Sequence, residues 1–518
     1  MKTIFPTGVT IYNPDRAYNG YFLEAPRMRY GNHEKSLYRS SNMQDDSGIT
    51  LRDMNGNIVN SWETPQSGMC LRTELQPNGD MFVMLREDKF MLYNWEGKLL
   101  ESVMPASFGK YSRNDGRLTS EGDIIYLLVR EVPKKFLKNV EDYPTKWWGV
   151  KKRKGVSLIG DSIIISDWKG NIKWQWNTWE HLDVNDFSPM TALSDWSHGN
   201  TCRILPENKW YDGGDKRFKP GNILYNPRNL DKIMIIDRDT KEIIWTWTHN
   251  ERGGMAHAHD PVMIEKGLPG AGNMLLFDNG LFPRSRSRVG QSIIYELNPQ
   301  TGEVVWRYDT VGYANMAFFS KTMGTQQRLP NGNTFISEDN VGRLFQVAPS
   351  SDHPDGGEIV WEYISRASVT RCSMVPYDYT PQLRALPRPK EMRVTPPGNW
   401  YTRIKPDSQR KNEQDVFELI AHDPEPKFPT TTGFAWLGFS LSSATVDELM
   451  LIQDFPMTQK LAEAINAWSR ENGGFRNTKD LLKVPGITKE LFDKFPVEMD
   501  KKFHVMLLYT GKLKGIKK

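Results

Sequence analysis

The stretch QPNGDMFVML, residues 76–85, places a Pro-Asn-Gly turn directly before five apolar residues. Pro, Asn and Gly favour tight turns, and an apolar run of this length after a turn indicates a buried β-strand. The pattern returns in TSEGDIIYLL at 119–128, KPGNILYN at 219–226, GAGNMLLFD at 270–278 and LPNGNTFIS at 329–337. The chain is therefore predicted to repeat one unit made of strands.

A second pattern completes each repeat. A Gly or charged turn leads into alternating apolar residues, and most copies end in an aromatic residue. The copies end near Trp62, Ser102, Trp176, Trp247, Trp306 and Trp361. Alternation with a period of two predicts strands, and six such units at roughly 50- to 70-residue spacing predict a six-bladed β-propeller. We expect the Trp residues to pack between blades, with a quinoprotein cofactor site as the alternative interpretation.

The composition is typical of a globular protein with more than one domain. The 518 residues exceed the size at which one core keeps growing, and 38% hydrophobic with 25% charged residues excludes a disordered chain. A net charge of +4, from 67 basic and 63 acidic residues, is too balanced to indicate a nucleic-acid or membrane partner.

The sequence says less about cellular location and about the chemistry of the cysteines. The start MKTIFPTGVTIYNP has no apolar run and nothing approaches a membrane span, so we expect a cytoplasmic protein as the chain stands. It would be periplasmic if a signal peptide had been removed. The three cysteines are far apart and form no CxxC motif, which argues against a disulfide framework or a thiolate metal site.

The pattern changes after the last repeat. Residues 367–408 are rich in Pro and Arg and predict a closing segment of the propeller, so the first domain is expected to span 1–408 and a linker 409–439. Apolar residues at helical spacing predict a small all-α domain at 440–518. Its stretch AINAWSRENGGFRNTKDLLKVPGI, residues 464–487, resembles the helix-hairpin-helix domains of competence-type DNA-binding proteins.

That resemblance implies phosphate binding by backbone N–H groups of Gly-rich hairpins. The first hairpin here reads DFPMTQ and has no glycine, and the second keeps only Gly486. Substituting glycine limits the approach of the backbone to a phosphate. We therefore expect a protein partner or self-association through this domain, with nucleic acid as the alternative.

Polar residues gather next to the predicted inner strands of the propeller. They are His198, Asn200, Arg228, His257, His259, Asp260, Asp278, Asn279, Thr325, Gln326 and Gln327. Because inner strands line the central channel, these side chains can converge on one site. Residues two apart share a face of a strand, so His257 is predicted to lie beside His259, and His198 beside Asn200.

The order of these motifs resembles the arylsulfate sulfotransferase family. It runs from DWSHGN at 195–200 through Arg228 and His259-Asp260 to GNMLLFDNG at 272–280 and QRLPNGN at 327–333. The opening GVTIYNPDRAYNGYFL, residues 8–23, resembles the start of the family, so the resemblance covers about residues 6–366. It implies a six-bladed propeller that transfers a sulfo group from a phenolic sulfate ester to a phenol without a cofactor.

The resemblance also implies roles for individual residues. His259 would take the sulfo group covalently, since a neutral imidazole is both a good nucleophile and a good leaving group. His198, Asn200 and Arg228 would hold the sulfuryl oxygens, with Thr325 nearby. We expect substrate contacts from His257, Asn279 and Arg288, the last of which belongs to an arginine cluster with Arg284 and Arg286.

One departure from the family pattern leaves functions other than sulfo transfer open. Members carry an early-blade histidine, and Cys70, Leu71 and Arg72 stand at that position here. If that histidine is the acid for the leaving phenol, another group such as Arg72 must serve. His198, His257 and His259 could instead bind a metal, or His259 could act as the general base of a lyase or hydrolase. A non-catalytic scaffold is the remaining hypothesis.

Overall fold

The computed structural model describes most of the chain. The described residues are 7–26, 48–63, 70–85, 89–104, 111–138, 140–141, 143–145, 149–151, 155–186, 194–249, 254–280, 291–310, 318–365, 367–395, 400–404, 417–421, 439–443, 445–450, 456–472, 474–475, 477–494, 497–499 and 505–507. They fall into two compact units, one within residues 1–421 and one within residues 422–518.

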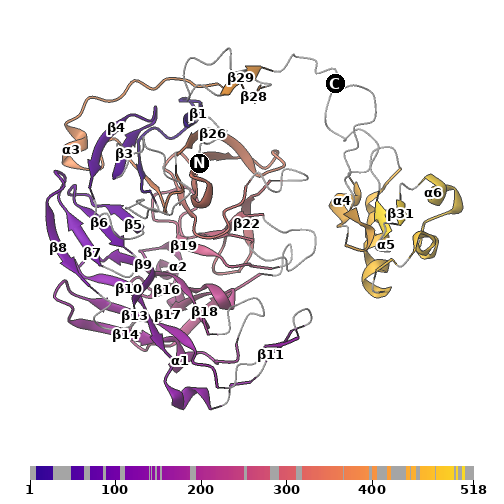
Figure 1. Cartoon of the computed structure of the whole chain (residues 1–518), viewed down its shortest axis with the longest axis horizontal. Coiled ribbons are helices and arrows are strands. Elements are labelled where there is room, and N and C mark those ends of the chain that lie inside the picture. The colour runs from indigo at the N-terminus through magenta and orange to yellow at the C-terminus, as the bar shows by residue number, and fades with distance from the viewer. Residues whose placement is uncertain are drawn as a thin grey trace. The chain divides into compact units, whose positions relative to one another are not determined.

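The first unit is a six-bladed propeller of antiparallel sheets (Figure 1). From the inner strand outward, the described blades are β27(Ser373–Val375)-β2(Tyr21–Glu24)-β3(Ile49–Asp53)-β4(Ile58–Trp62), β5(Cys70–Leu75)-β6(Met81–Leu85)-β7(Phe90–Tyr93)-β8(Leu99–Val103), β9(Tyr111–Leu118)-β10(Ile124–Glu131)-β13(Ile159–Ser166)-β14(Ile172–Asn177), β15(Gly199–Ile204)-β16(Ile223–Pro227)-β17(Ile233–Ile236)-β18(Ile243–Trp247), β19(His259–Met263)-β20(Met274–Asp278)-β21(Ile293–Leu297)-β22(Val304–Tyr308), and β23(Thr325–Arg328)-β24(Thr334–Glu338)-β25(Arg343–Pro349)-β26(Gly357–Ile364)-β1(Gly8–Tyr12). The second strand of each blade is buried along all or most of its length.

The two sequence patterns correspond to two strand positions in the blades. The five turn-then-strand stretches form the second strands β6, β10, β16, β20 and β24, and the six alternating stretches form the outer strands β4, β8, β14, β18, β22 and β26. The predicted six-bladed propeller is therefore confirmed. The outer strands alternate because only one of their faces packs on a neighbour.

Segments from both ends of the propeller sequence close the ring. Strand β1 pairs with β26 of the last blade, and β27, from beyond the last repeat, is the inner strand of the first blade. The Pro-rich segment that follows pairs with this region: Val394 bridges to Tyr12, and the Met392 N–H donates to Asn55 at 3.0 Å. The predicted closing segment thus supplies a strand to the fold as well as covering it.

Tryptophans of the outer strands join neighbouring blades, as the sequence predicted. Five indole N–H groups donate to backbone carbonyls in the next blade, in the turn before its outer strand: Trp62 to Asn94 at 2.9 Å, Trp176 to Lys241 at 2.9 Å, Trp247 to Gly302 at 2.9 Å, Trp306 to Gly356 at 2.8 Å and Trp361 to Met54 at 2.9 Å. Each bond satisfies a buried donor that would otherwise cost free energy.

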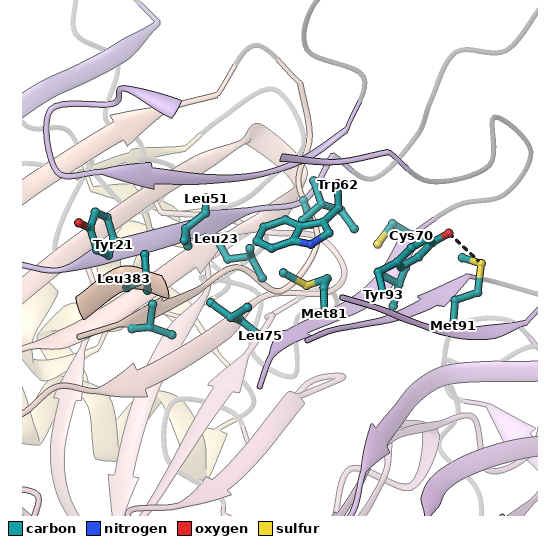
Figure 2. Packing of buried hydrophobic residues seen from close by; sticks show 14 of the residues in the cluster. Tyr21, Leu23, Leu51, Trp62, Cys70, Leu75, Met81, Met91, Tyr93 and Leu383 are labelled. Carbon is teal, nitrogen blue, oxygen red and sulfur yellow. Dashed lines mark hydrogen bonds between the residues drawn. The ribbon is translucent and has the colours of Figure 1, made fainter. Parts of the chain in front are cut away.

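The second blade, which ends in Ser102 instead of Trp, joins the third blade through a tryptophan of that third blade. Trp168, in the turn between β13 and β14, packs edge-on against Phe82 of β6 with ring centroids 6.2 Å apart. Figure 2 shows the preceding junction, where Trp62 and Leu51 of the first blade pack near Met81 and Tyr93 of the second.

Replacing Trp62 by Phe should lower the free energy of unfolding by about 1–3 kcal/mol, because the indole is fully buried and its hydrogen bond to Asn94 is lost. Denaturant unfolding measures this loss. Trp306→Phe is the matched control, since the Trp306 side chain is only half-buried and should cost less. Equal losses in both variants would contradict burial as the source of the stabilisation.

The remaining elements of the first unit are short. They are η2 (Lys134–Leu137), β11 (Tyr143–Thr145), β12 (Gly149–Lys151), α1 (Thr178–His181), α2 (Lys209–Asp212), η3 (Lys216–Phe218), η4 (Arg228–Leu230), η7 (Asp339–Val341), α3 (Pro381–Arg384), β28 (Trp400–Ile404) and β29 (Phe417–Ala421). Strands β28 and β29 pair with each other, and β29 lies inside the segment predicted as a linker. The predicted domain boundaries otherwise stay a prediction.

The second unit is mainly helical and has its own core. It contains η9 (Leu441–Ser443), α4 (Val446–Met450), α5 (Gln459–Asn472), η10 (Thr478–Lys483), α6 (Lys489–Lys494) and a sheet of β30 (Phe439–Ser440), β32 (Val505–Leu507) and β31 (Val497–Met499). Leu449, Leu461, Ile465 and Leu481 are buried together. The sheet is a correction to the predicted all-α composition: strands of two or three residues are too short to show a period.

None of the helices in the described residues is long and apolar enough to span a membrane.

Candidate functional site

The predicted site residues gather where the inner strands of the propeller begin, which we call the start face. His259 begins β19, Asn200 lies in β15 and Thr325 begins β23. His198 and His257 precede β15 and β19, Asn279 directly follows β20, and Arg228 begins η4 after β16. Equivalent strands of successive blades run in the same direction, so these positions meet at one face. Arg284, Arg286 and Arg288 lie outside the described residues.

Hydrogen bonds hold His259 in one tautomer. Asn279 donates its two amide protons to the carbonyls of Ser320 and Met323, at 2.8 and 2.7 Å, so its Oδ1 faces His259 Nδ1 at 2.6 Å. An amide oxygen is an acceptor only, so Nδ1 carries the proton. Nδ1 also lies 3.1 Å from the carbonyl oxygen of His257, a second acceptor for this proton. The lone pair of the ring is therefore on Nε2.

The electrostatic environment keeps His259 neutral. Burial lowers the pKa of the imidazole well below its usual value, and the charges of Arg371 and Arg228 lower it further. The side chain is 4% exposed. A neutral imidazole is the nucleophilic form, so the ring is held in the state that attack on sulfur requires.

The Nε2 lone pair already has a partner in this structure. The backbone N–H of Met323 donates to it at 3.1 Å. Met323 has φ of 63°, a left-handed conformation that is uncommon for a side chain of this size. The Met323 peptide thus contacts His259 through its N–H and Asn279 through its carbonyl. A substrate could reach Nε2 only after this peptide moves.

Two predicted neighbour relations on strands are wrong. His198 and His257 have φ of 45° and 61°, and both precede their strands. A positive φ reverses the local chain direction, so the alternation that would place His257 beside His259, and His198 beside Asn200, does not apply. His257 instead contributes its backbone: its N–H donates to Asp231 at 2.8 Å, and its carbonyl contacts His259.

His198 and Arg228 lie together at the start face. The Arg228 N–H donates to the carbonyl of His198 at 3.2 Å, and His198 Nδ1 contacts the carboxylate of Asp195. The His198 side chain is 20% exposed, in contrast to the buried His259. The charges of Arg228 and His198 both lower the pKa of His259. This half-open pair is the arrangement that could hold an anionic group beside His259.

Asn200 and Thr325 bind other protein groups in this structure. Asn200 donates to the carbonyl of Ala258 at 3.1 Å and accepts from Asn114 at 3.0 Å. The Thr325 hydroxyl donates to the carboxylate of Asp260. Both side chains are buried. They support the strand that carries His259, and neither faces an open space in these contacts.

Sequence reasoning missed a buried network of arginines and aspartates at the centre of the inner strands. Its members are Arg72 of β5, Asp115 and Arg117 of β9, Arg203 of β15, Asp260 of β19 and Arg371 before β27. Asp260 contacts Arg72 at 2.7 Å, Arg117 at 2.8 Å and Arg203 at 3.2 Å, and Asp115 contacts Arg72 at 2.6 Å, Arg371 at 2.9 Å and Arg117 at 3.3 Å. One signal was available: charged residues inside strands that otherwise read as buried.

The network sets the ionisation of its members. Burial raises the pKa of the Asp260 carboxyl, but the charges of Arg72, Arg203 and Arg117 outweigh it and hold this pKa well below its usual range. Burial lowers the pKa of Arg72, yet the neighbouring carboxylates raise it above its usual value overall. Arg72 therefore stays charged and cannot be the acid that replaces the missing family histidine. Cys70 cannot either, because burial raises the pKa of its thiol to about 12.

Asp339 joins the start of two inner strands. Its Oδ2 accepts from the N–H groups of Gly324 and Arg371, both at 2.9 Å, and its Oδ1 accepts from Ser337 at 2.5 Å. Burial raises its pKa from 3.8 to about 6. The folded protein then keeps the proton over a pH range in which the unfolded chain has released it, so the stability contribution of Asp339 falls as pH rises through this range.

Asp339→Asn should remove this pH dependence, because an amide oxygen can accept both N–H bonds and the amide nitrogen can donate to Ser337. Relative to the variant, wild-type protein should lose up to about 3 kcal/mol of unfolding free energy between about pH 4 and pH 6. Urea unfolding across this range, on both proteins, measures the difference. Parallel pH profiles would contradict a raised pKa at Asp339.

The three-histidine metal site has little support from the positions of its ligands. Among residues that the structure describes, no group of three or more His, Cys, Asp and Glu is arranged to hold a metal ion. Both ring nitrogens of His259 are hydrogen-bonded, and Nδ1 of His198 contacts Asp195.

The motif order along these inner strands agrees with a comparison against protein families. Residues 154–366 match the arylsulfotransferase (ASST) family model. This arylsulfotransferase segment runs from the third blade to the end of the last and includes every predicted site residue, from His198 to Thr325. Of the buried network, only Arg203 and Asp260 lie inside it, and Arg72, Asp115, Arg117 and Arg371 lie outside. Residues 437–496 match the helix-hairpin-helix motif, so both resemblances stated from the sequence are confirmed.

The similar solved structures are distant from this chain. A protein of unknown function from Bacteroides caccae is 10% identical, with 69% of this chain and 99% of that chain covered at a TM-score of 0.39. A virginiamycin B lyase from Staphylococcus aureus is 11% identical over 69% and 88% of the chains, and BamB from Moraxella catarrhalis is 13% identical over 64% and 89%, with TM-scores of 0.32 and 0.31. These scores support no argument about activity. No curated protein matches this chain.

Proposed function

We propose that this protein transfers a sulfo group from a phenolic sulfate ester to a phenol through a covalent intermediate on His259. The match of residues 154–366 to the arylsulfotransferase family supports this class of activity. The observation that carries the mechanism is the tautomer of His259: Asn279 fixes the proton on Nδ1, and so the lone pair is on Nε2.

The chemistry has two displacements. The Nε2 lone pair attacks sulfur, an N–S bond forms, and the bond between sulfur and the aryl oxygen breaks to release the phenol. The oxygen of the acceptor phenol then attacks the same sulfur, the N–S bond breaks, and the imidazole is regenerated. Arg228 would stabilise the negative oxygens in both steps. His198, held by Asp195, would give a proton to the leaving phenol and take one from the acceptor.

The contact between Met323 and Nε2 makes a movement part of this proposal. Attack requires the Met323 N–H to leave the lone pair. Met323 has a strained left-handed backbone, so a change of its conformation costs little stability. Met323→Gly should hold the capped conformation more firmly, because glycine adopts this φ without the strain that methionine carries. We expect a slower first displacement in this variant, measured as single-turnover release of the phenol.

The experiment for this function is the intact mass of the protein after incubation with 4-nitrophenyl sulfate, quenched at alkaline pH where a sulfohistidine survives. We expect a gain of one sulfo group in the wild type and its loss when a phenol is added. A chain that releases 4-nitrophenol without ever gaining mass would point to direct hydrolysis.

A second candidate is a non-catalytic propeller, and the capped lone pair of His259 favours it. In that case His259 would serve to tie β19 to the segment before β23 through Met323. Neither mass gain nor phenol release would then occur, while His259→Ala would still lower stability. The two candidates therefore differ in the first measurement on the wild-type protein.

For the helix-hairpin-helix unit we propose docking to a protein partner or to a second copy of this chain. Its core of Leu449, Leu461, Ile465 and Leu481 is independent of the propeller. Ending the chain at residue 421 should change the molar mass in solution, measured by light scattering, if the unit mediates self-association. An unchanged mass, with DNA retained by the full chain only, would favour the nucleic-acid alternative.

A further inference from the structure

A cavity of about 220 Å³ lies where the inner strands end, on the opposite face of the propeller from His259. We call this face the end face. Its lining comes from the last residues of the inner strands β5, β9, β15 and β19 and from the strands next to them. The residues are Glu74, Arg117, Leu118, Thr119, Ser120, Ile125, Arg203, Ile204, Leu205, Pro206, Leu224, Val262, Met263 and Glu265.

The chemistry of the walls is divided. Leu118, Ile125, Ile204, Leu224 and Val262 are apolar residues of the lining. Arg117 and Arg203 also line the cavity, and the guanidinium group of each contacts the buried carboxylate of Asp260. A cavity of about 150 Å³ with apolar walls holds one benzene molecule, so this space fits a single substituted ring.

Arg203 is incompletely satisfied by the protein. Its Nη2 reaches Asp260 only at 3.2 and 3.4 Å, and that carboxylate already accepts from Arg72, Arg117 and Thr325. Its Nε is buried and has no hydrogen-bond partner among the described residues. A buried donor of this kind costs free energy unless an acceptor reaches it.

The charges of the network leave room for one more anion. Four arginines, at 72, 117, 203 and 371, contact three carboxylates, at 74, 115 and 260. Arg203 is the most exposed of the four, with 23% of its side chain accessible, whereas Arg371 is 1% exposed. Two carboxylates also line the cavity: Glu265 is exposed there, and Glu74 is paired with Arg117. Their charges would repel a second negative charge on the occupant.

We propose that the end-face cavity binds a small organic monoanion, with a carboxylate or sulfo head group on Arg203 and a compact apolar ring against Leu118, Ile204 and Val262. This site is separate from the proposed sulfotransfer site and does not depend on it. Its head group would accept from the guanidinium group of Arg203, whose Nε has no hydrogen-bond partner among the described residues. The ring would gain from removal of its apolar surface from water.

The test is isothermal titration of the full chain with sodium benzoate, with benzenesulfonate as the second anion and benzamide as the neutral isostere. We expect saturable binding of one anion per chain, a choice between the two anions that identifies the preferred head group, and weaker binding of benzamide. Arg203→Met should reduce affinity at least about tenfold, since hydrogen bonds to charged groups are the stronger ones. Arg217→Met, which removes a surface arginine paired with Asp215, should change nothing.

Two further variants make the result decisive. Ser120→Trp places a bulky ring at an exposed position of the cavity lining, removes no charge and should also abolish binding. His259→Gln, which keeps an acceptor for the Met323 N–H, should bind benzoate as the wild type does. The proposal is overturned if the wild type shows no saturable benzoate binding, if benzamide binds equally well, or if His259→Gln loses binding while Arg203→Met and Ser120→Trp retain it.

Discussion

His259→Ala should abolish the sulfo adduct and reduce phenol release from 4-nitrophenyl sulfate by at least about 10⁴-fold. Removal of the attacking group eliminates the covalent pathway, and in enzymes with a covalent nucleophile such losses are typically 10⁴- to 10⁶-fold. Among the described residues, the Nε2 lone pair of His259 is the acceptor of the Met323 N–H. The variant will therefore also disturb this segment, and activity alone cannot separate chemistry from folding.

His259→Gln makes that separation. A glutamine oxygen can accept from Met323 in place of Nε2, so this variant should unfold close to the wild type yet form no adduct. His353→Ala, in an exposed turn of the last blade, is the control for removing any histidine and should keep full activity. A sulfo group that still appears in both His259 variants would place the nucleophile on another residue.

Asp260→Ala should lower the free energy of unfolding by about 3–5 kcal/mol, the largest stability loss that we expect from a single substitution in this chain. Asp260 is fully buried and its carboxylate contacts Arg72, Arg117 and Arg203. Without it, three buried guanidinium groups lose a shared counterion and repel one another. Guanidinium chloride would screen these charges, so urea unfolding is the measurement to use.

Asp239→Ala is the matched control for this loss. Asp239 also pairs with a cation, Lys219, but its side chain is 72% exposed, and a surface pair of this kind contributes less than about 1 kcal/mol. The loss of unfolding free energy for Asp260→Asn should lie between those for Asp260→Ala and Asp239→Ala, since the amide oxygen keeps part of the hydrogen bonding. A loss for Asp260→Ala no larger than that for Asp239→Ala would mean that water screens the network.

The start-face residues were predictable as a group but not in their contacts. Motif order placed His198, Asn200, His259 and Thr325 near the same ends of inner strands, and the structure brings them to one face. It could not show that Met323 covers the lone pair of His259, because that N–H arrives from the segment before the next inner strand, 64 residues away. Positive φ values at His198 and His257 could not be predicted either, since histidine is enriched at positive φ but adopts it in only a small minority of cases.

The repeat, the number of blades and the tryptophans that join them could be predicted from the sequence, because alternation and turn residues are local and each copy repeats the same physics. The residues around His259 in the chain also led to the prediction that it is the nucleophile. Which charges meet at the centre depends on how the blades come together. Arg72, Asp115, Arg203, Asp260 and Arg371 come from five different inner strands or their starts, and each is an ordinary charged residue in its own segment. Their burial, and the end-face cavity beside Arg203, arise from ring closure, which is a property of all six blades together.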